Sequence, residues 1–377
     1  MKWLNGYRMR LVLVGFVAAI VLSSGSAKAD FTFGEPENLG PNVNSAYLEN
    51  HPCISIDMLS LYFGSNRPGT SGERDIWITT RATIDDDWGS PVNIGPPVNS
   101  PLQDSNPYIS SNGLELYFSS ISRPGGFGYD DIWVSRLVSN REGEGVWGEP
   151  VNLGSSINTS AADYGPRLSA NGLELYFNSK GYGGFGGHDI FVAKRATVTD
   201  DWGAPVNLGP VVNGSTHDVN PTISTDGFCL IFSEHGSAGP YRPGGFGGAD
   251  IWMTTRPSLE SDWDSPVNLG PTVNGPSVDN TPYISPDGSI LYFSSSRSGG
   301  FGDRDLWQAR IIPTVDLNAD GIVDATDMVI MVDNWGTDNS LCDIGPMPWG
   351  DGVVDVEDLI VLAEHLFEEL PGRPIEP

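Results

Sequence analysis

The sequence is poor in cysteine, in basic residues and in long apolar stretches. Its three cysteines, Cys53, Cys229 and Cys342, stand far apart, so no framework of disulfide bridges holds the fold together. Lys and Arg number 20 against 48 Asp and Glu, and the net charge of −28 excludes a partner such as nucleic acid or an anionic membrane. Such acidity suits solubility and divalent-cation binding, although most of these carboxylates fit an ordinary solvated surface.

Catalytic signatures are also missing. The sequence has no Gly-x-Ser-x-Gly elbow and no phosphate-binding loop, and its five histidines share no zinc-type ligand spacing. It therefore assigns no catalytic residue.

A single apolar run lies near the N-terminus, at residues 11–22. Lys2, Arg8 and Arg10 precede it and Ala27-Lys28-Ala29 follows, a pattern typical of a secretory signal peptide. The run is shorter than the ~20 residues that span a bilayer, and an uncleaved anchor is the alternative. We expect residues 1–29 to be a signal peptide and the rest to be secreted, either extracellular or periplasmic, without membrane contact after cleavage.

The remainder is built from internal repeats. The phrase Trp-Gly-x-Pro-Val-Asn-Leu-Gly recurs at intervals of 55 to 61 residues, with some substitutions. Each copy leads into an acidic residue three positions before a proline, then a hairpin turn, then a strand beginning Asp-Ile-Trp or a close variant. Four short strands at a near-constant period predict propeller blades rather than a β-solenoid. The asparagines of the five copies are Asn38, Asn93, Asn152, Asn207 and Asn268.

The copies are offset by one strand relative to the repeats. No Trp-Gly phrase follows the fifth repeat, whereas a spare copy with Phe in place of Trp stands at Phe33–Gly40. We therefore expect residues 31–40 to form the outer strand of the last blade, beside residues 305–310. The sequence predicts an all-β five-bladed propeller of four-stranded antiparallel blades over residues 30–312, closed by its N-terminal strand.

A family resemblance agrees with this fold. The pattern Asp-Gly-x-x-Leu-Tyr-Phe-Ser-Ser-x-Arg-x-Gly-Gly-Phe-Gly, clearest from residue 287 onward, resembles the WD40-like PD40 repeats of TolB-type propellers. The resemblance covers residues 31–311 and implies the fold. It implies no single function, because such propellers serve as binding platforms, scaffolds and enzymes.

Residues 316–327 place oxygen ligands at EF-hand spacing, which suits calcium; a purely structural acidic turn is the alternative. The closing Asp and the helical stripe that follows resemble a type I dockerin. A second, longer loop matches less completely. We expect residues 313–370 to be a small all-α, dockerin-like EF-hand pair that folds with Ca²⁺, and residues 371–377 to be a tail. The ligands expected in the two loops are Asp316, Asn318, Asp320, Ile322, Asp324 and Asp327, and then Asp343, Asp351, Val353, Asp355 and Asp358.

The dockerin resemblance also implies a partner. In dockerins the tenth and eleventh loop residues help to select a cohesin, and the matching positions are Ala325 and Thr326 in the first loop and Val356 and Glu357 in the second. A cohesin-like partner is therefore expected at these four residues.

Three features of the propeller are candidate ligand sites. Acids at the starts of the inner strands are expected to gather at one channel mouth, where they either hold a cation or polar ligand or cap their own turns. The Arg-x-Gly-Gly-Phe-Gly loops either bind sugars through their Phe and Arg side chains, or their Phe packs between blades and their Arg pairs with a neighbouring Asp. In the fourth repeat, Glu234, His235 and Tyr241 break the symmetry and mark either a ligand site or a tolerated insertion. The repeated acids are Glu49, Asp104, Asp163, Asp218 and Asp279.

Together these features favour a secreted, non-catalytic binding or scaffold propeller, monomeric, with a carbohydrate or protein ligand and a calcium-dependent module for display. The alternative is a polysaccharide-degrading enzyme, an O-glycosyl hydrolase or a lyase, with its site at the channel mouth. Hydrolysis needs two acids in distinct roles, and among the obvious acids only Glu234 is not a copy repeated in the other blades.

Overall fold

A computed structural model describes residues 31–139, 145–235 and 242–313 and, toward the C-terminus, residues 315–317, 322–337, 342, 344–345 and 353–367. The expected signal peptide, the tail at 371–377 and Tyr241 lie outside the described residues. In the part that is described, no helix combines the length and the apolar character needed to cross a bilayer.

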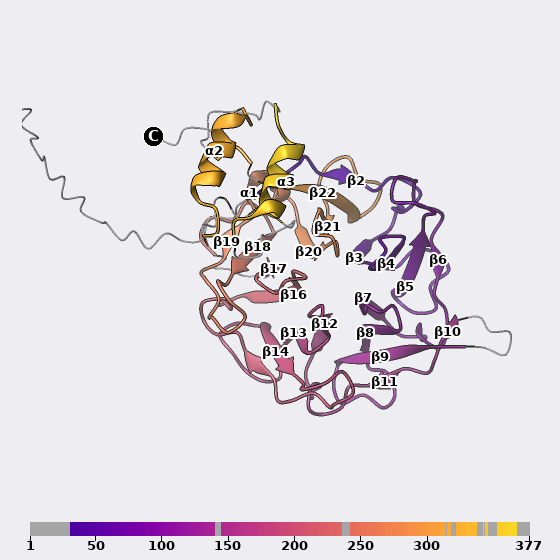
Figure 1. Ribbon diagram of the computed structural model, residues 1–377. Coiled ribbons are helices and arrows are strands. Elements are labelled where there is room, and N and C mark those ends of the chain that lie inside the picture. Colours follow the sequence, from indigo (N-terminus) through magenta and orange to yellow (C-terminus); the bar gives the residue numbers. More distant parts are fainter. Residues whose placement is uncertain are drawn as a thin grey trace, which may run out of the picture.

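Five antiparallel sheets stand around a central axis, and the first strand of each faces that axis (Figure 1). The predicted five-bladed propeller of four-stranded blades is confirmed. The first blade contains β3 (Glu49–Ile54), β4 (Ser60–Ser65), β5 (Asp75–Thr80) and β6 (Val92–Asn93), and the second contains β7 (Asp104–Ile109), β8 (Glu115–Ile121), β9 (Asp130–Ser139) and β11 (Val151–Asn152), with the short strand β10 (Gly145–Trp147) also paired with β9. The third blade contains β12 (Asp163–Leu168), β13 (Glu174–Ser179), β14 (Asp189–Lys194) and β15 (Val206–Asn207). The fourth contains β16 (His217–Ile223), β17 (Cys229–His235), β18 (Ala249–Thr255) and β19 (Val267–Asn268).

The fifth blade closes the ring with strands from both ends of the propeller. It contains β20 (Asp279–Ile284), β21 (Ile290–Ser295) and β22 (Asp305–Pro313), preceded by the one-turn helix α1 (Gly270–Val273). The N-terminal strands β1 (Phe31–Phe33) and β2 (Glu37–Asn38) pair antiparallel with β22, Phe33 opposite Ile311 and Asn38 opposite Trp307. The expected closure by residues 31–40 is thus confirmed.

The core lies between the blades because each sheet is covered on both faces by its neighbours. The second strands carry a Leu-Tyr-Phe run, with Ile231 in place of Tyr in the fourth blade, and the Leu and Phe of every copy are fully buried. Successive strand residues point to opposite faces, so Leu and Phe contact one neighbouring blade while the residue between them contacts the other. These residues are Leu61, Phe63, Leu116, Phe118, Leu175, Phe177, Leu230, Phe232, Leu291 and Phe293.

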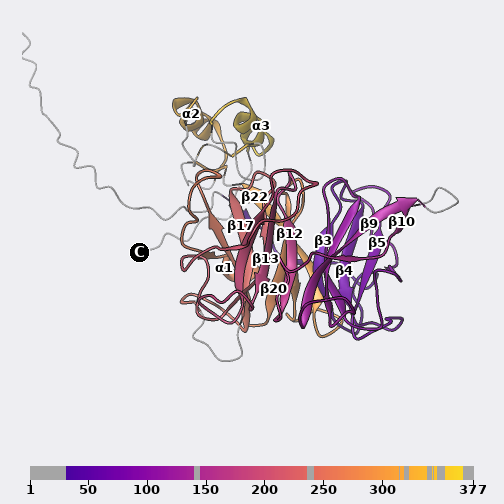
Figure 2. The same ribbon diagram turned by 90° about the horizontal axis from the view of Figure 1, so that it is seen from below.

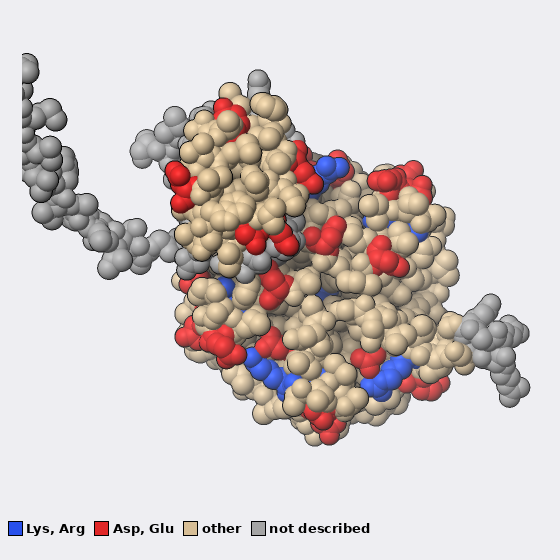
Figure 3. All heavy atoms as spheres, in the orientation of Figure 1, with Lys and Arg blue, Asp and Glu red and all other residues tan. Residues whose placement is uncertain are grey.

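Beyond β22 the chain forms two short helices, α2 (Ala325–Asp333) and α3 (Val356–Glu364), which lie on one face of the disc (Figure 2). Asp324 and Asp355 cap their N-termini through matching capping boxes. Val323, Met331, Val354 and Leu362 are buried in a small core of their own. Figure 3 shows the face that carries these helices: Asp and Glu outnumber Lys and Arg on it, and its centre is hollowed.

Candidate functional site

The five repeated acids are fully buried and engaged within their own blades. Asp279 is representative: the Gly275 amide donates to its Oδ2 at 2.6 Å, while Ser295 Oγ and Arg297 Nη2 donate to Oδ1 at 2.5 and 2.8 Å. These contacts are those expected of an acid that caps its own turn. The other acids are Glu49, Asp104, Asp163 and Asp218.

The arginines of the glycine-rich loops pair with these acids in four blades. Each also donates to a backbone carbonyl and lies over aromatic rings of its blade, as Arg297 lies over Phe293 and Trp307 with its guanidinium carbon 4.9 and 5.3 Å from the ring centroids. The loop phenylalanines are exposed and not packed between blades. The ion pairs are Arg67–Glu49, Arg123–Asp104, Arg242–Asp218 and Arg297–Asp279.

The third blade departs from this rule. Gly181 stands where the other blades have arginine, and the hydroxyl of the next residue, Tyr182, lies 3.2 Å from the equivalent carbonyl oxygen, that of Ile157. Among the described residues no Lys or Arg pairs with Asp163, and burial raises the pKa of this carboxyl. The third blade thus keeps the carbonyl contact and loses the ion pair.

The symmetry-breaking residues of the fourth blade are partly engaged. Glu234 is buried, and its carboxylate accepts from Thr216 Oγ1 at 2.6 Å and from the backbone amide of Arg242 at 3.1 Å. His235 stacks on His217, with ring centroids 5.3 Å apart and planes inclined by 24°. Glu234 therefore holds the Thr216 side chain and the backbone of Arg242, whereas His235 belongs to a cluster of histidines.

That cluster lies where the inner strands begin. His188 and His217 face each other across the boundary between the third and fourth blades, with their Nδ1 atoms 2.8 Å apart, and the ring of Tyr164 meets that of His188 edge-on. Nε2 of His188 is buried without a partner among the described residues. Burial lowers the pKa of His188 and of His235 to about 4, and it also lowers that of His217. The three imidazoles are therefore neutral at neutral pH.

The residue just before the aspartate of each third strand differs from blade to blade. Each of these residues bridges to the residue just before the acid of the next inner strand, so all five belong to the same channel mouth. At Asp130, burial raises the pKa to about 8, and the neighbouring Asp131 and Asp163 raise it further while Arg74 opposes them. Its Oδ1 is buried without a partner among the described residues. The five residues are Arg74, Asp130, His188, Ala249 and Arg304.

A second varied ring lies deeper, at the third residue of each inner strand counted from the acid. There the pairing with the second strand shifts and φ turns positive, from 52° at Thr281 to 70° at Gly165. A positive φ is costly for a β-branched residue such as Thr281, of order 1–3 kcal/mol, and all five blades adopt it. Asn106 Nδ2 donates to Asn220 Oδ1 at 3.1 Å although the two lie in the second and fourth blades, so these side chains meet inside the ring. The positions are His51, Asn106, Gly165, Asn220 and Thr281.

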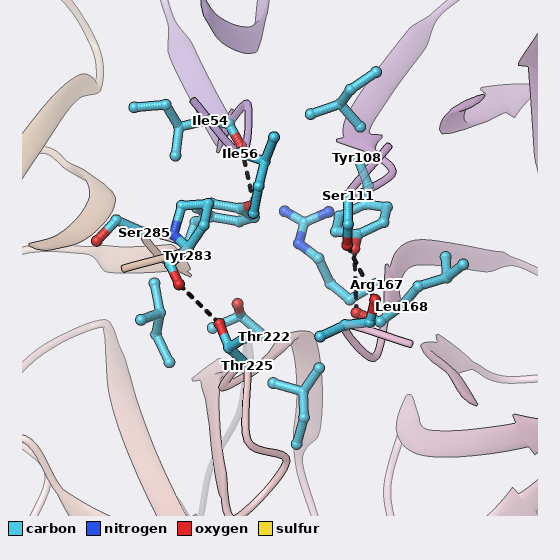
Figure 4. Close-up of a pocket in the computed structure, with 15 residues that line it drawn as sticks. Ile54, Ile56, Tyr108, Ser111, Arg167, Leu168, Thr222, Thr225, Tyr283 and Ser285 are labelled. Carbon is cyan, nitrogen blue, oxygen red and sulfur yellow. Dashed lines mark hydrogen bonds between the residues drawn. The ribbon is translucent and has the colours of Figure 1, made fainter. Parts of the chain in front are cut away.

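A third varied ring lies at the opposite end, at the residue after each inner-strand proline. Four of its residues, all but Cys53, line a small pocket of about 60 Å³, into which Arg167 projects between Tyr108 and Tyr283 (Figure 4). The ring comprises Cys53, Tyr108, Arg167, Thr222 and Tyr283.

Sequence reasoning missed all three rings. It took repetition as the signal, but repeated residues maintain the architecture of each blade. The useful signal was the reverse: positions at which the five repeats differ although the acid and the proline beside them agree.

The C-terminal loops place two expected calcium ligands in the interior. Asp327 accepts from the amides of Leu317 and Asp324 at 2.7 and 2.8 Å, and Asp358 accepts from those of Ile344, Gly345 and Asp355. Asp316 is partly buried, and Ile322 and Val353 are exposed. The expected partner-binding residues Ala325, Thr326, Val356 and Glu357 lie exposed in the first turns of α2 and α3.

Calcium fits the chemistry of this donor set, which consists of hard carboxylate and carbonyl oxygens. The remaining expected ligands, Asn318, Asp320, Asp343 and Asp351, lie outside the described residues. Within the described ranges no group of three or more His, Cys, Asp or Glu side chains is arranged to hold a metal.

No family model and no curated protein matches the chain. Solved structures are similar to it in their propeller fold. TolB from Acinetobacter baumannii is 12% identical with a TM-score of 0.41, and the match covers 76% of this chain and 64% of TolB, less than two thirds of that protein. An α-L-arabinofuranosidase from Lactobacillus brevis is 13% identical with a TM-score of 0.48, over 73% of this chain and 92% of the enzyme. A native arabinanase from Bacillus subtilis is 14% identical with a TM-score of 0.46, over 73% and 97%. These likenesses concern the fold, and they assign no activity to the chain.

Proposed function

We propose that this chain is a secreted, non-catalytic binding protein. Its propeller holds a polar ligand on the channel axis, and its C-terminal module is a dockerin-like, calcium-dependent attachment device. One observation carries the proposal for the propeller: the acids that every blade repeats are engaged by hydrogen bonds within the blades, whereas the side chains on the axis vary at three successive levels. Architecture accounts for the first set but gives no reason for the second.

Unsatisfied polar atoms support a ligand on the axis. His51 Nδ1, Arg74 Nε, Asp130 Oδ1 and His188 Nε2 are all buried without a partner among the described residues. Buried polar groups in native proteins almost always find a partner, whether protein, ordered water or ligand. Hydroxyl and carboxyl groups of a carbohydrate would supply such partners.

The alternative, an O-glycosyl hydrolase or lyase, has less support. A glycosidase needs two carboxyl groups with separate roles. Asp130, with its raised pKa, has the protonation state of a general acid, but Glu234, the other singular acid, is engaged by Thr216 and Arg242. Binding without hydrolysis therefore fits the described side chains better.

The experiment for the propeller combines affinity electrophoresis with a product assay over a panel of neutral and acidic polysaccharides. We expect retarded migration in at least one gel, without reducing ends or unsaturated products. Products that disappear in Asp130→Asn, but persist in the exposed control Asp303→Asn, would establish the enzyme instead. No retardation by any polysaccharide would refute carbohydrate binding.

For the C-terminal module, charge is the main support. Residues 313–370 contain 14 Asp and Glu and neither Lys nor Arg. Asp327 and Asp358 are fully buried within this acidic segment. The many carboxylates of this segment, which contains no Lys or Arg, repel one another, and a divalent cation at each loop offsets that repulsion. We therefore assign Ca²⁺ to the loop ending at Asp327 and a second Ca²⁺ to the loop ending at Asp358.

Calcium titration by calorimetry tests the module, with Asp327→Ala and the exposed helix-end control Asp333→Ala. We expect Asp327→Ala to lose one site and Asp333→Ala to retain both. For the partner, immobilised protein should capture a cohesin-like domain in calcium and release it in chelator. Ala325→Arg with Thr326→Arg should abolish capture without changing calcium affinity; capture that ignores chelator would contradict the attachment role.

A further inference from the structure

Arg167 is a buried cation without a counter-ion. Its residue is 3% exposed, and the guanidinium carbon lies 5.8 and 5.4 Å from the ring centroids of Tyr108 and Tyr283. Nη1 donates to the carbonyl oxygens of Pro166 and Pro107 at 2.8 and 3.2 Å. No acidic residue in the described part of the chain pairs with it, in contrast to the four loop arginines, each of which has its acid.

The other edge of the guanidinium is free. Nε is buried without a partner, and no described residue accepts from Nη2. Nε and Nη2 share the edge of the guanidinium plane that receives two oxygens of one carboxylate side-on. A buried charge left unpaired in this way is strongly unfavourable, so its retention points to a group that completes it on binding.

The free edge lies beside a pocket of suitable size. The pocket of about 60 Å³ is lined by aliphatic side chains, among them Ile54, Ile109 and Ile284, and by hydroxyl residues at its rim (Figure 4). Two of these hydroxyls are already used: Ser111 Oγ donates to the Ala170 carbonyl at 3.2 Å and Thr225 Oγ1 to that of Pro286 at 2.9 Å. The apolar walls exclude water and strengthen any charge contact made within.

Positive charge gathers around one axial residue although the chain is acidic overall. The pKa of His51, which lies on the same axis, is held well below its usual value by burial and then by Arg74, Arg167 and Arg304. Three arginines thus act on one axial residue in a chain whose net charge is −28. The surroundings of His51 and Arg167 therefore favour an anion even though the outer surface does not.

We propose that this pocket binds a compact oxyanion group, a carboxylate or a sulfate ester, on the Nε and Nη2 edge of Arg167. This inference rests on the proposed function and names its ligand class: an acidic rather than a neutral saccharide, with its anionic group seated between Tyr108 and Tyr283.

The test is calorimetry at constant ionic strength on the calcium-loaded chain without residues 1–29. Acetate, inorganic sulfate, an acidic oligosaccharide bearing carboxylates, a sulfated one and a neutral one of the same length are the probes. We expect one of the acidic oligosaccharides to bind at least about tenfold more tightly than the neutral one, because hydrogen bonds to a charged group contribute more than neutral ones. The two simple anions then distinguish carboxylate from sulfate as the recognised group.

Two variants and a matched control test the role of Arg167 directly. Arg167→Met should abolish the preference for the acidic oligosaccharide without lowering Tm, because it removes an unpaired buried charge. Thr222→Glu places a carboxylate in the same ring of side chains and should block anion binding while raising Tm. Arg136→Met, which removes an exposed arginine paired only with Glu115, should change neither.

Failure of the anion site and failure of the proposed function give different results. Equal binding of acidic and neutral oligosaccharides, unchanged in Arg167→Met, would overturn the anion site and leave carbohydrate binding intact. Absence of binding to every oligosaccharide, with the simple anions still bound, would refute carbohydrate binding and leave the anion site.

Discussion

Asn38 Nδ2 donates to Asp305 Oδ2 at 2.8 Å, joining two residues that are 267 positions apart in the chain. The same bond lies within a single repeat in the other blades, for example between Asn207 and Asp189 at 2.8 Å. In all five blades the asparagine Oδ1 also accepts from the amide of a glycine two residues later and from a second asparagine, as Asn38 does from Gly40 and Asn44. A local contact copied in each blade therefore becomes the closure of the ring at Asn38.

Asn38→Ala should lower the free energy of unfolding by about 1–3 kcal/mol, because it leaves buried partners without their hydrogen bonds. Asn207→Ala is the matched control, since it removes the same contacts within one contiguous blade. We expect Asn38→Ala to unfold faster than Asn207→Ala in denaturant jumps, because the closing strand separates first. Equal unfolding rates would contradict closure as the weak point.

Deleting residues 31–40 should lower Tm by more than about 10 °C, measured by calorimetry. The deletion exposes the edge of β22 and removes the buried Phe31, whose burial alone contributes about 2 kcal/mol. An unchanged Tm would show that β1 and β2 are dispensable.

The closure was predictable because it follows from counting. A spare copy of the Trp-Gly phrase at Phe33–Gly40, with none after Arg310, leaves the last blade one strand short. The extra strand β10 is not predicted by the repeat pattern: Val146 pairs with Val138 on an extension of β9. Nothing in the repeat pattern marks an insertion that adds a strand outside the ring.

The ion pair that the third blade lacks gives a further prediction. Asp279→Asn should cost about 3 kcal/mol, because it leaves the half-buried Arg297 without its carboxylate. Asp163→Asn should cost less than about 1 kcal/mol at neutral pH, because no arginine faces Asp163 and an amide oxygen still accepts from Thr159. Chemical denaturation of the two variants measures the difference, and equal costs would show that the arginines contribute little.

Asp130 should make stability fall as pH rises. Its pKa is about 8 in the folded chain, well above that of an unfolded Asp, so the folded state holds the extra proton between about pH 4 and pH 8. The stability from that proton is present at acidic pH and is lost as pH rises through this window. Asp130→Asn should therefore be more stable than the native chain at pH 8, by up to about 5 kcal/mol, and equal to it near pH 4. The control Asp303→Asn should show no pH-dependent difference.

The histidine cluster should make stability fall as pH is lowered, which is the opposite of the effect expected for Asp130. The pKa values of His188 and His235 are about 4 in the folded chain, below that of an unfolded histidine, so the unfolded state binds more protons between about pH 4 and pH 6.5. Stability should fall as pH drops through this window, by about 1–2 kcal/mol for each residue after allowance for partial exposure. His188→Gln should flatten the acid limb of a Tm-against-pH profile, whereas the C-terminal His365→Gln should leave it unchanged.

These axial residues illustrate what sequence reasoning could not reach. His188, His217 and His235 follow no common spacing, and they meet because parallel bridges join the third blade to the fourth and β17 pairs with β16. In the sequence nothing distinguishes Arg167 from other strand residues, because it stands among the repeated positions Asp163 and Pro166. Only the ring geometry brings the five dissimilar positions to one axis, and the shift in register that gives His51 and Thr281 positive φ has no sequence marker.

Removal of calcium should affect the two parts of the chain differently. The blades owe their stability to packed Leu, Tyr and Phe side chains and to interlocked asparagines, none of which needs a metal. The C-terminal segment has a small core around Met331 and Leu362, an excess of acidic residues and helices of nine residues each, which are too short to be stable alone. In chelator we therefore expect amides of α2 and α3 to lose their protection from hydrogen exchange while those of β4, β8 and β13 keep theirs.

Asp358→Ala should reproduce part of this loss in saturating calcium, and the exposed control Glu364→Ala should not. Protection of α2 and α3 that survives chelator would mean that this core folds without metal, and the buried Asp327 and Asp358 would then serve only as helix-capping residues.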